Sequence, residues 1–161
     1  MKLHKAVCIM ALLATPTVFA QSGSQKSFTK LKSLAGTWEG KTSNGQPVRE
    51  SYRLTANGSA LMSEIESEHN MITMFHLDGD RLLMTHYCGA GNQPRMKAVV
   101  PGDGSSVAFD FLDATNLASP EAGHMHRAVF TLVDANHLTE EWVWRQDGKE
   151  KTEHFELQRT K

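Results

Sequence analysis

The sequence has little cysteine: 161 residues contain two, Cys8 and Cys88. Cys8 lies in an N-terminal segment that we expect to be removed, so we predict no disulfide within the mature chain. A chain without disulfides has to be stabilised by a packed apolar core. The remaining thiol, Cys88, is therefore either a small buried side chain or a functional group.

The sequence also lacks an excess of charge of one sign. It contains 17 Lys and Arg against 18 Asp and Glu, and its formal net charge is −1. This balance provides neither the basic footprint of a nucleic-acid-binding protein nor a polybasic patch for a membrane surface. The apolar run from Ala6 to Leu13 is too short to span a bilayer. We predict no nucleic-acid partner and no integral membrane segment in the mature chain.

The first residues have the features of a secretory signal. Two lysines precede the short apolar run, and Val18 and Ala20 provide the small residues of a signal peptidase site. We predict that residues 1–20 are a signal peptide cleaved after Ala20, and that the product is periplasmic or secreted. Residues 21–161, about 140 residues, have the usual length of one domain.

From residue 36 to the end, short runs of β-forming residues alternate with turn signals. Asp78-Gly79, for example, suits the positive-φ turn between two antiparallel strands. The spacing of Phe28, Leu31 and Leu34 predicts a short helix over 27–34. One long connection is expected at 113–122, with a helical turn near 114–117. The predicted strands are 36–43, 47–55, 59–68, 71–77, 81–88, 94–100, 105–112, 123–133, 137–146 and 149–158.

Ten consecutive strands on short turns predict an all-β fold: a closed or nearly closed up-and-down antiparallel barrel with a short N-terminal helix. Closure is favoured because it removes unpaired strand edges. In such a barrel the side chains of each strand alternate between the interior and solvent. Val48, Tyr52 and Leu54, for example, share the face that we expect to point inward.

The predicted helix, the Gly36-x-Trp38 motif after it and the strand meander together resemble the calycin superfamily, which includes lipocalins, fatty-acid-binding proteins and nitrobindin-like barrels. The stretch DGDRLLMTHYCGAGNQPRM also resembles a group of exported bacterial proteins of unknown function. The resemblance implies a barrel with a cavity and with Trp38 closing one end. No position matches the haem-ligating His of nitrobindin-like barrels, so haem is not implied, and we predict no cofactor.

Alternation also places polar side chains on apolar faces, where burial is costly unless they are paired. These polar residues come from four predicted strands, and we expect them to line one cavity. The loop before residue 95 is expected to add a polar mouth over it. The predicted ligand-binding residues are Glu50, Tyr52, His86, Cys88, Asn92, Gln93, Arg95, His124, His126, Glu140 and Trp142.

The sequence favours an exported barrel that binds a small, partly apolar molecule through these groups. A metal site formed by His86, Cys88, His124 and His126 is an alternative. Another is a hydrolase or isomerase with Cys88 as nucleophile or His86 as general acid or base. No nucleophile elbow accompanies Cys88, so binding is favoured over catalysis. A surface interaction module with a solid barrel is the remaining alternative.

Overall fold

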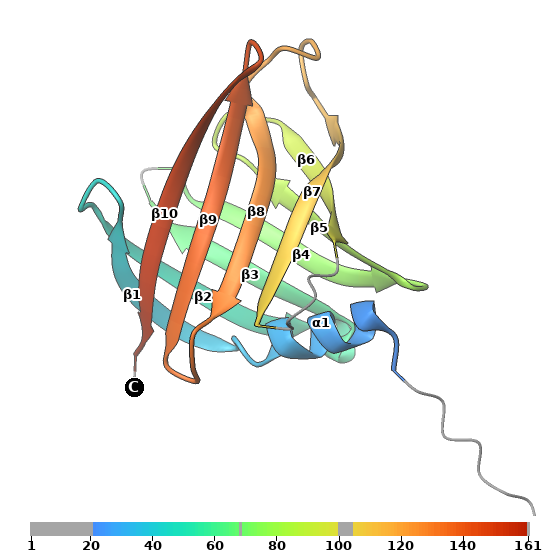
Figure 1. The fold of residues 1–161 in the computed structure, drawn as a ribbon, viewed down its shortest axis with the longest axis vertical. Coiled ribbons are helices and arrows are strands. Elements are labelled where there is room, and N and C mark those ends of the chain that lie inside the picture. The colour runs from blue at the N-terminus through green and yellow to red at the C-terminus, as the bar shows by residue number, and fades with distance from the viewer. Residues whose placement is uncertain (1–20, 68, 100–104, 161) are drawn as a thin grey trace, which may run out of the picture.

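In a computed structural model of the chain, residues 21–67, 69–99 and 105–160 are described, and the predicted signal peptide lies outside them. Ten antiparallel strands form a closed barrel, shown in Figure 1, which confirms the predicted fold class. Each strand pairs with its neighbours in sequence, and the first pairs with the last. The strands are β1 (Gly36–Thr42), β2 (Pro47–Thr55), β3 (Ala60–Glu66), β4 (Met71–Asp78), β5 (Arg81–Tyr87), β6 (Gln93–Val99), β7 (Ser106–Thr115), β8 (His124–Leu132), β9 (His137–Gln146) and β10 (Lys149–Arg159).

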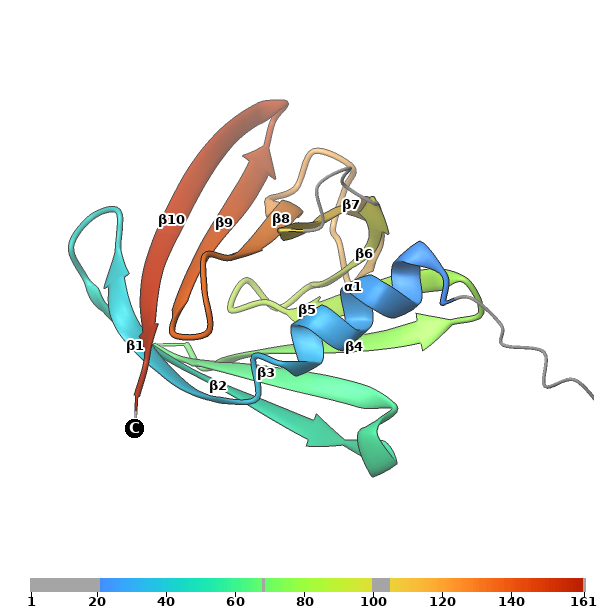
Figure 2. The same ribbon diagram turned by 60° about the horizontal axis from the view of Figure 1, so that its bottom comes forward.

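Helix α1 (Gly23–Lys32) lies across one end of the barrel, which we call the helix end (Figures 1 and 2). It begins earlier than the predicted 27–34, because Ser22 and Gln25 form a reciprocal capping box that starts the helix at Gly23, and it ends at Lys32. The helix contacts β4 and β5. Its buried face presents Phe28 and Leu31 to the barrel.

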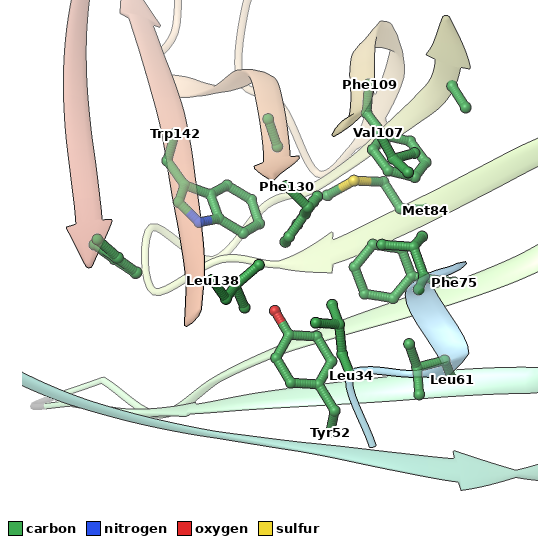
Figure 3. Packing of buried hydrophobic residues seen from close by; sticks show 14 of the residues in the cluster. Leu34, Tyr52, Leu61, Phe75, Met84, Val107, Phe109, Phe130, Leu138 and Trp142 are labelled. Carbon is green, nitrogen blue, oxygen red and sulfur yellow. The ribbon is translucent and has the colours of Figure 1, made fainter. Parts of the chain in front are cut away.

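The half of the barrel near the helix end is filled. Phe75, Phe109 and Phe130 form a cluster with ring centroids 5.4–6.0 Å apart (Figure 3). Trp38 is fully buried at this end, and its Nε1 donates a hydrogen bond to the Leu34 carbonyl at 2.8 Å. Rings packed edge to face stabilise a core beyond the area that they bury.

We call the other end of the barrel the open end. Five of the connections between strands lie there. Because neighbouring strands run in opposite directions, each odd-numbered strand ends here and the next strand begins here. The five connections at the open end are 43–46, 67–70, 88–92, 116–123 and 147–148.

Two local predictions were wrong. Leu54 is on the inward face of β2 but is 44% exposed, because it lies near the end of the strand, beyond the packed interior. The helical turn expected at 114–117 is not formed, because β7 extends to Thr115 and pairs there with Gln93 of β6. Backbone pairing with β6 therefore outweighs the local preference for a turn.

Candidate functional site

The open end of the barrel contains a cavity of about 500 Å³, a usual size for a small-molecule site. Its walls are aromatic, aliphatic and Met side chains, and a Lys and a Glu of β10 contribute charge. The hollow excludes a solid barrel. The lining residues are Thr42, Ile65, Met71, His86, Met125, Trp142, Trp144, Lys151, Glu153 and Phe155.

His86 is the buried polar side chain of this lining. It is 1% exposed, and its ring packs against that of Trp142 with centroids 4.9 Å apart. Nδ1 lies 2.9 Å from Oγ1 of Thr73 on the neighbouring strand. Among the described residues Nε2 has no hydrogen-bond partner. Burial lowers the pKa of His86 to about 4, so the imidazole is neutral at pH 7.

A cluster of buried polar groups lies behind Trp142. Tyr52 donates its hydroxyl to Oε1 of Glu140 at 2.5 Å, and Trp142 Nε1 donates to Oε2 of the same carboxyl at 2.8 Å. Ser63 donates its hydroxyl to Oε1 of Glu50. Figure 3 shows the Tyr52 hydroxyl and the Trp142 indole inside the same part of the barrel. The cluster joins β2, β3 and β9 and holds Trp142 in the cavity wall.

Burial raises the pKa of Glu50 well above its usual value, and the charge of Glu140 and a hydrogen bond with it raise the pKa further. Burial also raises the pKa of Glu140, but the hydrogen bonds from Glu50, Tyr52 and Trp142 oppose this shift. Burial therefore favours the neutral form of both carboxyl groups, more strongly for Glu50 than for Glu140, which accepts hydrogen bonds from Tyr52 and Trp142. Glu50, Tyr52 and Glu140 form a connected site below the cavity and are absent from its lining.

His124 and His126 are not brought to the same cavity, which differs from our expectation. A bulge between Met125 and Arg127 interrupts the pairing of β8 with β9. A bulge adds a residue to one strand and reverses its alternation beyond that point. Met125 therefore lines the cavity, whereas the two histidines line a separate groove beneath the 116–123 connection.

In that groove the histidines are connected in a chain. Nη1 of Arg145 lies 3.1 Å from His126 Nε2, and His126 Nδ1 lies 3.3 Å from His124 Nε2. The chain ends at the Ala122 carbonyl, 2.8 Å from His124 Nδ1. Burial and the charge of Arg145 lower the pKa of His126. No cluster of three potential metal-ligating His, Cys, Asp or Glu side chains occurs within 21–67, 69–99 and 105–160.

Cys88 lies just beyond the end of β5 and lines neither the cavity nor the groove. The thiol is half-buried, and its burial raises its pKa. The thiolate, which is the nucleophile and the metal ligand, is therefore disfavoured. The structure does not join Cys88 to the two histidines of the groove, because the turn at 88–92 and the β8 bulge direct these side chains to different places.

The predicted mouth residues instead hold the connection after β7. Asn92 donates Nδ2 to the Gly123 carbonyl at 2.8 Å, and Thr115 donates its hydroxyl to Gln93 Oε1 at 2.7 Å. Arg95 forms an ion pair with Asp113 and is exposed. None of the three predicted residues lines the cavity, because strand pairing of β6 with β7 directs them toward β7 and the 116–123 connection.

The lining residues Met71 and Met125 were not among the predicted binding residues, and neither was Thr73, the partner of His86. Alternation with buried Phe75 places Met71 and Thr73 on the inner face of β4, so the pattern contains a signal for both. Met125 had no such signal, because the bulge that turns it inward leaves no local signature in the sequence.

Among the described residues, no helix has the length and apolar character needed to cross a membrane. No family model matches the chain. No curated protein matches it either.

Among solved structures, the chain is similar to a protein of unknown function of the DUF3598 family from Nostoc punctiforme, with a TM-score of 0.56 and 13% sequence identity. The match covers 81% of this chain and 49% of that one, so the chain spans about half the length of that protein. At this identity the similarity concerns the barrel fold alone.

Proposed function

We propose that this barrel binds a small, partly apolar molecule in the cavity at its open end. The observation that carries the proposal is the combination of apolar walls with one buried, unsatisfied nitrogen, His86 Nε2, within the described residues. Small-molecule sites typically combine a largely apolar surface with a few polar groups that orient the ligand.

The composition of the wall supports this proposal. Met71 and Met125 provide flexible, polarizable side chains that adapt to different ligand shapes. Trp142 and Trp144 provide large rigid surfaces, and the hydrogen bond from Trp142 to Glu140 keeps the first of these rings in place. A ligand in the cavity therefore contacts a pre-formed wall on one side and an adaptable one on the other.

The experiment that tests the proposal blocks the cavity. We expect Met71→Trp to fill part of it and to weaken the binding of the neutral apolar dye N-phenyl-1-naphthylamine by roughly tenfold or more. Binding is measured by dye fluorescence and by quenching of the cavity tryptophans. Met74→Trp is the matched control, because Met74 lies three residues away on the outer face of β4. Equal loss of binding in both variants, or in neither, would contradict the proposal.

The proposed compartment is the periplasm or the exterior, reached by removal of residues 1–20. The support is the N-terminal sequence: two lysines, a short apolar run and the small residues Val18 and Ala20. Expression of the full chain followed by fractionation and N-terminal sequencing tests this. We expect exported protein beginning at Gln21. A cytosolic product that retains the first 20 residues would contradict the proposal.

A further inference from the structure

Thr73 and His86 face each other across two paired strands, and both side chains are buried. They are directly opposite in the β4–β5 register, with 2.9 Å between Thr73 Oγ1 and His86 Nδ1. Thr73 is 1% exposed, as is His86. At this distance the two atoms share a hydrogen bond, and the direction of that bond decides which nitrogen of His86 carries the proton.

The direction of this hydrogen bond follows from the need of the buried Thr73 hydroxyl to donate its proton. A buried hydroxyl that does not donate its proton loses the hydrogen bond it had with water. Among the described residues, Nδ1 of His86 is the side-chain acceptor within reach of the Thr73 hydroxyl. Thr73 therefore donates and Nδ1 accepts. Because the buried imidazole is neutral, its proton is on Nε2.

His86 consequently offers an N–H donor to the cavity. The side chain lines the cavity, Nδ1 is bound to Thr73 in the barrel wall, and Nε2 has no partner among the described residues. A donor left without a partner in apolar surroundings is unfavourable. The group that satisfies it has to be an acceptor supplied by the occupant. A metal ion, which needs the lone pair of a ring nitrogen, does not fit this tautomer.

The charges around the cavity favour a neutral acceptor over an anionic one. An anionic group placed beside His86 would lose its hydration in this mainly apolar part of the cavity, and the neutral imidazole would supply no compensating positive charge. At the rim, Lys151 and Glu153 contribute one charge of each sign, so the entrance provides no net attraction for an anion.

We propose that the cavity selects apolar molecules that carry a neutral carbonyl group, whose oxygen accepts a hydrogen bond from His86 Nε2. This inference rests on the proposed small-molecule-binding function. The carbonyl lies at the inner part of the cavity beside Trp142, and the apolar body of the ligand contacts the Met and aromatic walls. A second polar atom, Thr42 Oγ1, also lacks a partner among the described residues and is available to a polar substituent.

The test uses two probes of nearly the same shape, 2-acetylnaphthalene and 2-ethylnaphthalene, which differ by the carbonyl oxygen. We expect the wild-type chain to bind the ketone at least about tenfold more tightly than it binds 2-ethylnaphthalene. In His86→Phe the two probes should bind equally. The infrared carbonyl band of the bound ketone should shift to lower frequency in wild type and remain unshifted in the variant.

The outcomes separate this inference from the proposed function. If both probes bind wild type with equal affinity, the barrel is a binder but the carbonyl inference is overturned. If neither probe binds, the proposed function fails and the inference fails with it. Tighter binding of 2-naphthoate than of the ketone would overturn the preference for a neutral group.

A second measurement needs no variant and therefore does not depend on whether His86→Phe folds. Nitrogen-15 NMR of the histidine side chains distinguishes the two neutral tautomers. We expect the proton of His86 on Nε2 in the wild-type chain at pH 7. A proton on Nδ1 in the wild-type chain would overturn the inference.

Discussion

Glu50 and Glu140 bring two carboxyl groups into a barrel interior that is otherwise mainly apolar. They are tolerated because the raised pKa of Glu50 favours its neutral form, which lowers the repulsion between them, and because Tyr52 and Trp142 donate hydrogen bonds to Glu140. The pair thus positions a cavity residue, Trp142, at the cost of making barrel stability depend on pH.

That dependence has a definite sign. Burial raises the pKa of Glu50 in the folded barrel well above its usual value of 4.5. Between pH 4.5 and the raised value the folded state binds more protons than the unfolded state, so stability falls as pH rises. Glu50→Gln keeps the shape without an ionisable proton. We expect the variant to unfold about 3 °C or more above wild type at pH 8, with no such gain at pH 4.

Thermal unfolding followed by circular dichroism from pH 4 to 9 measures the difference between the two proteins. Glu64→Gln is the matched control. Glu64 lies on the outer face of β3, between the buried residues Ser63 and Ile65. A gain for Glu50→Gln that is the same at every pH, or that is shared by the control, would contradict the assigned protonation.

Among single elements, β8 differs most from what alternation predicts. In β2 and β9, counting every second residue correctly placed Glu50, Tyr52, Glu140 and Trp142 inside the barrel. In β8 the same count failed, because the bulge after Met125 exchanges the two faces. Alternation is a property of regular pairing, so it identifies inward side chains only between irregularities.

Gly123, the residue immediately before β8, allows Trp144 to lie in the cavity wall. A Cβ atom at position 123 would overlap the Trp144 ring. We expect Gly123→Ala to displace the ring, to lower stability by about 1–3 kcal/mol, and to weaken dye binding. Urea unfolding and the dye titration measure the two effects.

The control for this substitution is the double variant Gly123→Ala, Trp144→Leu, in which the smaller side chain removes the overlap. Its stability should match that of Trp144→Leu alone, because the two changes then no longer conflict. Equal destabilisation by Gly123→Ala in both backgrounds would show that the glycine is needed for another reason.

For the whole molecule, the strand count and the closure of the barrel could be predicted from the sequence, because both depend on local patterns of strand and turn residues repeated ten times. The division of the interior into a filled half and a hollow half could not be predicted from the sequence. It depends on how α1 and the Phe cluster fill the helix end, and on which side chains of ten strands meet at the other end. Such volumes follow from packing in three dimensions.

Arg159, the last residue of β10, connects the closing β1–β10 pair to the segments before β1 and β9. Its guanidinium donates to the carbonyls of Ser33, Ala35 and Ala135 and lies 4.2 Å from the centroid of the Trp38 ring. We expect Arg159→Ala to cost about 2 kcal/mol, measured by urea unfolding. Arg159→Lys should recover only part of this, because an ammonium cannot reproduce the planar fork. Full recovery by Lys would show that charge alone matters.

Carbon-13 methyl NMR of the methionines, during titration with 2-acetylnaphthalene, shows whether the open end of the barrel receives a ligand against His86. We expect saturable shifts for Met71 and Met125, which line the cavity, and none for Met62 and Met74, which face outward on β3 and β4. Saturable shifts confined to Met62 and Met74, or no saturable shift at all, would show that the cavity receives no ligand.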